Sequence, residues 1–393
     1  MIRVAEGRGG KDFVTGARCR HLAGDLGRPA DRAMTLLADT AGRRVWLATG
    51  YHQARELMRD RRFSRAAASS AVCLRGPALR MSITEMDPPM HTSIRNLVGG
   101  AFSARQVERL RPLVEKLADR LLAALLGGGR TADLLAEFCA PLTFYSHCAL
   151  LGVPEHRREA IRRRSVQRIG GASVSEAETY SAELLLHDEV AEMIADRGLR
   201  PAGLLGALIA AHHERHALDE SALTGLAASL FFDGHMLSAA QIANTVLMVL
   251  TSGLFGRLTS DPAALDELIE ESFRYCPSVN LSMSRVATAD LTLGGIRLGA
   301  GDQVAAAIPL ANRDGTVFAT PERFVPGRPT RHLTFGYGTH HCIGAHLTRV
   351  QVRAALLALL RRMPNLRLAT SERELTWFVS PTMRSLSGLP VRW

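Results

Sequence analysis

The apolar residues of the chain recur mostly with the spacing of amphipathic helices. That spacing runs from residue 88 to residue 126 with a break at 99–104, and it returns from 344 to 361. Residues 219–251 carry the longest uninterrupted helical pattern, which is apolar nearly all round in its middle. Such a helix has no solvent-facing side, so we expect it to lie buried through the centre of the molecule.

Strict alternation of apolar and polar residues is confined to short stretches. Residues 43–50 alternate and are rich in β-branched and aromatic residues, which predicts a strand that turns at Gly50, followed by a short helix over 51–60. Residues 291–308 are typical of short strands joined by glycine turns. The sequence therefore predicts a mainly α fold with a small β-rich region.

No linker or internal repeat divides the 393 residues. This length could hold two domains, but large single-domain enzymes also reach it, and we expect one domain over 1–393. Apolar residues make up 47% of the chain, which is enough to bury a sizeable core. The segment of about 1–20 is polar and aperiodic, so we expect it to be loose.

Charge and cysteine content limit the kinds of binding partner and the cellular compartment that we expect. The formal net charge is +10, but acids lie between the arginines and no single basic tract stands out, so nucleic-acid binding is weakly supported and an acidic protein partner fits at least as well. No long apolar run opens the chain, so we expect neither a signal peptide nor a membrane anchor. The six cysteines lie far apart and form no CxxC pair, which argues against a disulfide framework and against a zinc site. We therefore expect a soluble protein in a reducing cytoplasm.

The stretch FGYGTHHCIG, residues 335–344, carries the strongest chemical signal. Its glycines let the backbone turn tightly and approach a flat ligand. Cys342 directly precedes the predicted helix, where backbone N–H groups without helical partners can point at the sulfur and stabilise a thiolate. A structural zinc site needs four protein ligands, whereas haem iron needs one axial cysteine, so we favour a haem ligand over a buried structural cysteine.

This loop resembles the haem-binding loop of the cytochrome P450 (haem-thiolate monooxygenase) family, whose pattern is Phe-Gly-x-Gly-x-His/Arg-x-Cys-x-Gly. The matching residues are Phe335, Gly336, Gly338, His340, Cys342 and Gly344. The resemblance implies the triangular, mainly helical prism fold of that family. It also implies haem b with the Cys342 thiolate as axial ligand, which favours cleavage of the O–O bond.

A second family feature precedes the loop. Glu271 and Arg274 lie three apart on one helix face and can pair, and a PERF stretch follows at 321–324. Taken alone, such a pair would be read as a solvated surface pair. In the family it joins a third residue, here Arg328, and the resulting triad has a structural role beneath the haem.

The resemblance also implies cations for the carboxylates of haem. His91 and Arg95, four apart on one helix face, match one family segment, and Arg285 and His340 match two further positions. Arginine suits this role because its planar guanidinium binds a carboxylate through two parallel hydrogen bonds. Singly, each residue would be read as a surface charge, and the set in family order favours the haem role. The resemblance implies no haem-binding role for His341.

The central helix departs from the family in its catalytic motif. The family usually has Ala/Gly-Gly-x-Asp/Glu-Thr-Thr/Ser, whose acid and first alcohol help to deliver protons, whereas this chain has DGHMLS at 233–238. Gly234 and the second alcohol, Ser238, remain, but Met236 and Leu237 replace the acid and the first alcohol. Asp233 points elsewhere on a helix that turns 100° per residue. Either the motif has drifted in an ordinary hydroxylase, or a polar group of the substrate completes proton delivery.

The resemblance implies an enzyme of bacterial specialised-metabolite biosynthesis that oxidises a small organic molecule. The oxidation would be a hydroxylation or the oxidative formation of a ring or bond. NAD(P)H would supply electrons through a ferredoxin reductase and a ferredoxin, the latter docked on the cysteine side at Arg105, Arg109, Arg349 and Arg353. We expect a monomer. The alternative from another class is a haem-binding sensor or carrier without turnover.

The substrate-selecting residues of the family lie in variable segments. In this chain they are expected in 66–84 and 165–185, near Leu281 and around Thr382. One sequence offers no template for these segments, so it does not name the substrate.

Overall fold

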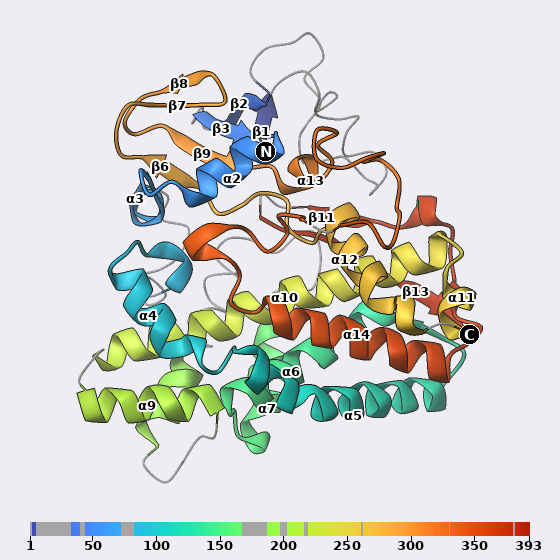
Figure 1. Ribbon diagram of the computed structural model, residues 1–393. Coiled ribbons are helices and arrows are strands. Elements are labelled where there is room, and N and C mark those ends of the chain that lie inside the picture. Colours follow the sequence, from blue (N-terminus) through green and yellow to red (C-terminus); the bar gives the residue numbers. More distant parts are fainter. Residues whose placement is uncertain are drawn as a thin grey trace.

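The computed structural model describes the chain over a defined set of ranges. These are 2–4, 33–39, 44–71, 82–166, 187–196, 203–215, 219–260, 262–329, 331–379 and 382–393. Figure 1 shows the long helices stacked together, with most of the labelled strands gathered above them in this view.

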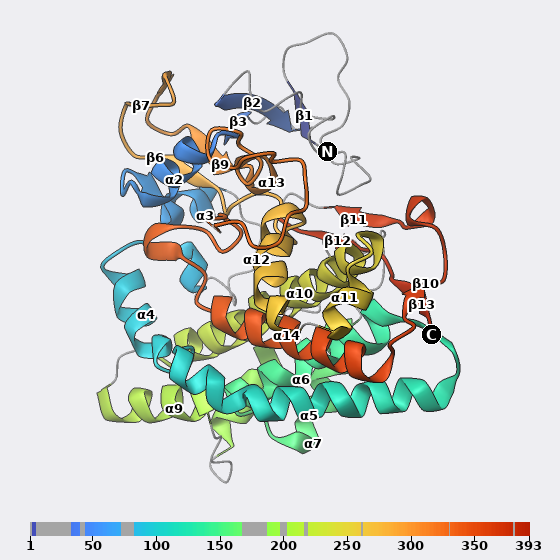
Figure 2. The same ribbon diagram turned by 45° about the vertical axis from the view of Figure 1, so that its right-hand side comes forward.

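The helix α10 (Glu220–Thr251) passes through the middle of this stack (Figures 1 and 2). It begins after Asp219, whose side chain accepts a hydrogen bond from the Ala222 N–H at 2.7 Å and so caps the first turn. It packs against α6 (Ala140–Leu151), α9 (Gly203–Arg215), α12 (Leu265–Tyr275) and α14 (Ala345–Arg362). The long helix α5 (Ala104–Gly128) in turn packs against α6 and α14.

Shorter helical elements complete the described structure. The remaining α-helices are α2 (Tyr51–Arg59), α3 (Arg65–Ala71), α4 (Met90–Gly99), α7 (Glu155–Val166), α11 (Phe255–Ser260) and α13 (Ile308–Ala311), and residues 187–195 are also helical. The 3-10 turns are η3 (Ile83–Glu85), η5 (Pro262–Ala264), η6 (Gly338–His340) and η7 (Glu372–Glu374), and η4 (Leu135–Cys139) is a π-helix.

The largest sheet has the strand order β1-β2-β3-β9-β6-β4. Its strands are β1 (Ile2–Val4), β2 (Met34–Asp39), β3 (Arg44–Ala48), β4 (Phe63–Ser64), β6 (Arg285–Ala287) and β9 (Gln303–Ala306). Only the β3–β9 pair among them is parallel, with Val45 opposite Gln303. This sheet and α2 share an apolar cluster that is separate from the main helical core.

Three smaller sheets involve the C-terminal half. They pair β7 (Leu291–Leu293) with β8 (Ile296–Leu298), β11 (Trp377–Val379) with β12 (Arg384–Leu386), and β13 (Pro390–Arg392) with both β5 (Thr131–Asp133) and β10 (Arg367–Leu368). Thus the last residues of the chain pair with a strand that follows α5, more than half the chain away.

The elements predicted from apolar spacing are largely confirmed. The central helix, the helix after Cys342, the break between α4 and α5, and the strands within 291–308 lie where the pattern predicts them. Within the segment of about 1–20 that we expect to be loose, Ile2–Val4 pair with β2. Residues 5–20 lie outside the described ranges.

Two further expectations concern the membrane and the cysteines. No helix within the described ranges combines the length and apolarity needed to cross a bilayer. The cysteine spacing argues against a disulfide framework; among the described cysteines Cys139, Cys148 and Cys342 are free, and Cys276 is disulfide-bonded.

Candidate functional site

The loop that carries Cys342 is held in one shape by its glycines and by α2. Gly336 and Gly338 have φ angles of 70° and 74°, in the left-handed region that favours glycine. A Cβ at Gly338 would lie 2.9 Å from the Met58 carbonyl oxygen on α2, so no side chain fits there. The Cys342 N–H donates to the Phe335 carbonyl at 2.8 Å and closes the loop.

The thiol of Cys342 lies in an unusual environment. Burial raises its pKa, and hydrogen bonds from the backbone N–H groups of Gly344 and Ala345, with the charges of Arg95 and Arg349, oppose that rise. The residue itself is nonetheless exposed, whereas Cys139 and Cys148 are buried. A thiol enclosed by the molecule, open on one side and supplied with backbone donors, fits an axial ligand to a non-protein metal group.

The predicted cations of the haem carboxylates come together from three elements. The rings of His91 on α4 and His340 on η6 lie 4.0 Å apart, centroid to centroid. Burial together with the charges of Arg285, His91 and Arg65 lowers the pKa of His340 to about 3. Arg95 differs in one respect, because its guanidinium donates to the His341 carbonyl at 2.6 Å and so also holds the cysteine loop.

Arg285 shows that this cluster suits an anion. The side chain is buried, and burial lowers its pKa to about 10. One guanidinium nitrogen donates to the Phe63 carbonyl at 3.2 Å, but the buried Nε has no partner among the described residues. A buried guanidinium that keeps an unused donor beside two histidines fits a carboxylate, and haem b carries two. The residues present therefore fit the cofactor.

Arg65 joins this cluster, and the sequence analysis missed it. Its side chain is buried at the start of α3, donates to the Thr84 carbonyl at 2.7 Å and reaches the Ser284 carbonyl next to Arg285. The nearby carboxylate is Asp87, which accepts bonds from the Ser64 hydroxyl and the Arg65 N–H. Nothing in the local pattern distinguishes Arg65 from its neighbouring arginines; only the tertiary packing does.

The structure brings the predicted triad together between α12 and the PERF segment. Glu271 and Arg274, both fully buried, form two hydrogen bonds of 2.8 Å, and the Arg328 Nε donates to the same carboxylate at 3.1 Å. Arg274 also donates to three backbone carbonyls, those of Asn312, Pro321 and Arg323. The pair thereby ties the PERF segment to α12.

Residues 233–238, which depart from the family's catalytic motif, lie in an unbroken stretch of α10. Met236 and Leu237 are half-buried and apolar, while the buried Ser238 hydroxyl donates to the Gly234 carbonyl at 2.9 Å. The Ser238 hydroxyl also lies 3.1 Å from the Thr348 hydroxyl on α14. The retained alcohol is thus linked to the helix that follows Cys342.

A buried histidine on α6 packs against the same motif. A Cβ at Gly234 would lie 2.3 Å from the His147 Nε2, so glycine is required there by packing. The His147 Nδ1 lies 2.9 Å from the Thr143 carbonyl and must donate to it, and burial lowers the histidine pKa to about 4. The ring of His235 is 6.4 Å away. Both histidines lie in strongly apolar stretches, and sequence reasoning gave them no role.

The predicted substrate-selecting segments lie mostly outside the described residues. Residues 72–81 and 167–185 are not described, and Thr382 is exposed. Leu281 pairs with Ala307 and is 6% exposed, packed with Leu47 and Leu310 in a small core cluster. Its substrate role therefore stays a prediction.

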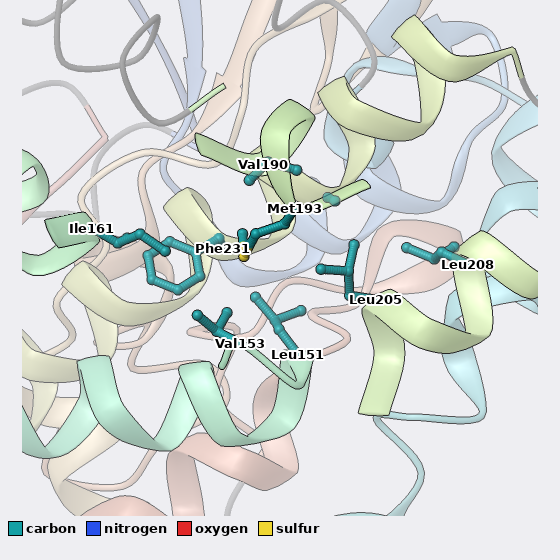
Figure 3. A pocket seen from close by; sticks show the side chains of 9 residues that line it. Leu151, Val153, Ile161, Val190, Met193, Leu205, Leu208 and Phe231 are labelled. Carbon is teal, nitrogen blue, oxygen red and sulfur yellow. The ribbon is translucent and has the colours of Figure 1, made fainter. Parts of the chain in front are cut away.

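A small apolar cavity lies between the end of α6 and the helices α9 and α10 (Figure 3). Its lining is entirely apolar and includes Leu151, Val153, Leu205 and Phe231, and its volume is about 10 Å³. That is barely the space of one water molecule, with no polar partner to hold it. The cavity is a packing gap in the core and is too small for a substrate.

The arginines proposed for an acidic partner are less available than the sequence suggests. Arg349 pairs with Glu270 through bonds of 2.5 and 2.9 Å, and Arg353 pairs with Asp266 at 2.9 Å. Against the opposing effect of burial, His332 and Arg349 lower the pKa of Glu270 to about 2. These pairs line an open hollow of about 460 Å³ between α5, α12 and α14.

Arg105 and Arg109 on α5 are the less engaged members of that set. Both side chains are exposed, and neither forms an ion pair with another described residue. Arg109 donates to the Gln106 side chain at 3.3 Å. The charge of this face therefore rests more on α5 than on α14.

Comparison with known proteins agrees with this geometry. Residues 263–372, which span the triad and the cysteine loop, match the family model "Cytochrome P450". The chain is 34% identical to mycinamicin IV hydroxylase/epoxidase of Micromonospora griseorubida, over 90% of each chain. It is 36% identical to the cytochrome P450 monooxygenase PikC of Streptomyces venezuelae, over 93% of this chain and 88% of the relative.

Similarity extends to solved structures. The P450 enzyme CxnD, for C–S bond formation in chuangxinmycin biosynthesis, superposes with a TM-score of 0.86 at 26% identity, over 97% of this chain and 95% of that structure. These relatives are named for catalysis, and none supports a sensor or carrier without turnover. The chain belongs to the cytochrome P450 family.

Proposed function

We propose that this cytochrome P450 binds haem b through the thiolate of Cys342 and oxidises a small natural-product molecule. The observation that carries the proposal is the thiol itself, which is enclosed by protein, open on one side and faced by the N–H groups of Gly344 and Ala345. When bound, the haem would supply the activation of dioxygen and the oxidation of the substrate.

The protein residues around the cofactor have distinct roles. His91, Arg95, Arg285 and His340 bind the two haem carboxylates, and Arg285 supplies a buried donor with no other partner among the described residues. Phe335 packs behind the loop, 5.0 Å from Phe273, and excludes water from the sulfur side.

The structural triad has a role of its own. Glu271, Arg274 and Arg328 hold the PERF segment and the backbone around Asn312, whose side chain in turn accepts from the Leu333 N–H at 2.7 Å. In this way the triad fixes the shape of the cysteine loop from below and acts as a positioning device, without contact to substrate.

On the substrate side, α10 presents few groups that can move a proton. Ser238 is the one alcohol of the family motif that remains, and its hydroxyl donates to the Gly234 carbonyl. Met236 and Leu237 cannot exchange protons. We therefore propose that a hydroxyl or amide of the bound substrate, with ordered water, completes the hydrogen-bond chain next to Gly234.

The partners and conditions follow from this chemistry. Electrons come from NAD(P)H through a ferredoxin reductase and a ferredoxin, which docks on the cysteine side near Arg105 and Arg109, and dioxygen is the oxidant. These electron donors work in the cytoplasm, and we propose that the chain acts there as a monomer and as one domain. The P450 relatives support natural products as the substrate class, with hydroxylation, epoxidation or bond formation as the outcome.

The ligand assignment is tested by spectroscopy of two cysteine variants. Cys342→Ser should abolish the long-wavelength Soret band of the reduced carbon monoxide complex, because that band requires a thiolate ligand. Cys148→Ser is the matched control, since Cys148 is also a free thiol but is covered within α6. Survival of the band in Cys342→Ser would show that another residue ligates the iron.

Turnover is tested separately with the haem-loaded protein. A panel of pathway metabolites is first screened for binding by the spin-state shift of the Soret band. With a metabolite that binds, the protein should consume NADPH only when a ferredoxin system is present, and it should form an oxidised product. Incorporation of labelled dioxygen into the product indicates hydroxylation or epoxidation, and its absence indicates oxidative bond formation. Consumption without any product would contradict the proposed function.

A further inference from the structure

Arg349 on α14 is engaged by contacts inside the molecule. Its guanidinium donates to both oxygens of the Glu270 carboxylate on α12, at 2.5 and 2.9 Å, and to the Ala345 carbonyl in the first turn of α14 at 3.3 Å. The same carboxylate lies 3.2 Å from the His332 Nε2. An arginine that already binds a carboxylate through two parallel hydrogen bonds is poorly placed to bind another on a docked protein, so a different role fits it better.

The guanidinium of Arg349 also lies against the aromatic side of the cysteine loop. Its central carbon is 4.6 Å from the centroid of the Phe335 ring and 5.8 Å from that of Phe273. Phe335 begins the loop, and its carbonyl accepts the 2.8 Å hydrogen bond from the Cys342 N–H. A cation is attracted to the face of an aromatic ring, so this contact holds the arginine charge next to the loop.

The charge of Arg349 acts on the cysteine sulfur, and Glu270 limits it. Burial raises the pKa of the Cys342 thiol, and the positive charge of Arg349 is one of the influences that oppose this rise. Burial also opposes the ionisation of Glu270, but the bonds from His332 and Arg349 lower its pKa to about 2. Glu270 is therefore charged at neutral pH and offsets part of the arginine charge. The electrostatic environment of the sulfur depends on both members of the pair.

A second ion pair repeats this arrangement one helical turn further from the loop. Asp266 precedes Glu270 by four residues on α12, Arg353 follows Arg349 by four residues on α14, and Arg353 donates to Asp266 at 2.9 Å. The Asp266 side chain is 71% exposed, whereas that of Glu270 is 23% exposed. Because water and salt screen exposed charges more strongly than covered ones, the Glu270–Arg349 pair has the larger effect on the loop.

We propose that Glu270 and Arg349 together set the reduction potential of the haem bound at Cys342. Arg349 acts through Phe335 and the cysteine loop as a positioning residue, and Glu270 balances its charge. A positive charge near the iron ligand stabilises the reduced form, which carries one more electron, and so raises the potential, whereas a negative charge lowers it. The role rests on the proposed function, because it requires haem iron at Cys342, but it requires no docked partner.

The test measures the midpoint potential of the purified haem-loaded protein, titrated with dithionite and redox dyes at pH 8 in the absence of any partner. Glu270→Gln removes the negative charge at similar volume, so the potential should rise and the ferric-to-ferrous ratio at a fixed potential should fall several-fold. Arg349→Gln leaves the carboxylate without its cation, so the potential should fall. The Glu270→Gln/Arg349→Gln double variant carries the same net charge as the parent and should return close to the parent potential.

Two further variants separate the charge of the pair from other effects. Asp266→Asn is the matched control, because it removes one acid from the same hollow one turn further from the loop, and it should change the potential less than Glu270→Gln does. Arg349→Lys keeps the charge without the planar guanidinium and should lie closer to the parent than Arg349→Gln. If Glu270→Gln yields no haem protein, the comparison of Arg349→Gln with Arg349→Lys decides the same question.

The signs of the shifts give the proposal its decisive readout. Shifts of opposite sign that cancel in the double variant support it, since structural damage would not reverse its effect between the two single variants. Parent potentials in both single variants, or shifts of the same sign that do not cancel, overturn it. A parent protein without the thiolate Soret band in its reduced carbon monoxide complex would instead refute the proposed function. Where that band is present, the potentials decide the role of the pair alone.

Discussion

Removal of the Glu271 carboxylate should destabilise the whole fold, because this group holds two arginines and a backbone segment. In the structure it accepts two bonds of 2.8 Å from Arg274, one of 2.7 Å from the Val325 N–H and one of 3.1 Å from Arg328. Glu271→Ala leaves the fully buried Arg274 charge without its counter-ion, which typically costs about 3–5 kcal/mol. A fold has about 5–15 kcal/mol in total, so we expect little soluble haem protein.

The surface of the same protein offers a matched control for this prediction. Glu108 and Arg111 on α5 form a pair with the same spacing of three residues, with bonds of 2.6 and 2.8 Å, but their side chains are 43% and 29% exposed. Exposed pairs contribute about 0–1 kcal/mol, so Glu108→Ala should be nearly neutral. The yield of soluble haem protein compares the two variants directly, and urea unfolding followed by far-ultraviolet circular dichroism measures the loss in each variant that can be purified. Equal losses in the two variants would refute the argument from burial.

Four further predictions follow from the site. Burial lowers the pKa of His147 from 6.5 to about 4, so on acidification the imidazole is protonated in the unfolded chain before it is protonated in the folded protein. The free energy of unfolding should therefore fall by about 3 kcal/mol as the pH drops from 6.5 to 4, and the unfolding of His147→Gln should depend less on pH. Gly234→Ala should cost about 1–3 kcal/mol in urea unfolding, because its Cβ meets the His147 ring, and His147→Ala should relieve that cost in the double variant. Arg285→Leu should release haem to apomyoglobin about 10- to 150-fold faster than the parent, through loss of a charged hydrogen bond of about 1.5–3 kcal/mol, and an unchanged rate would exclude contact with a haem carboxylate. A substrate analogue that lacks the proposed polar group should form product about 10²–10⁴-fold more slowly than the substrate. The Met236→Glu/Leu237→Thr variant should recover part of this rate. If the parent enzyme forms product from substrate and analogue with equal yield per NADPH consumed, substrate-assisted proton delivery is refuted.

The sequence was informative wherever the signal is local. The all-apolar stretch of α10 and the glycine–cysteine loop each lie within a few turns of chain, so their periodicity and composition were enough to predict them. The β5–β13 pairing could not be predicted in this way, because three-residue strands show no periodicity and their partners are far apart in sequence. Arg65 and His147 were missed for the same reason, since each acquires its surroundings only through tertiary packing.

On the proposed function, the apolar residue at 236 changes what the enzyme requires of its substrate. Hydroxyl groups such as those of Ser238 and Thr348 can pass a proton along, but they do not supply one at neutral pH, because neither is an acid in that range. The nearby His147 is no better source, since its lowered pKa keeps the ring neutral and its Nδ1 proton is committed to the Thr143 carbonyl. The proton must therefore enter through water or through a donor on the bound molecule. A molecule that fits the pocket but lacks such a donor would still bind, yet it would be oxidised poorly, so selectivity in this enzyme would arise in the chemical step as well as in binding.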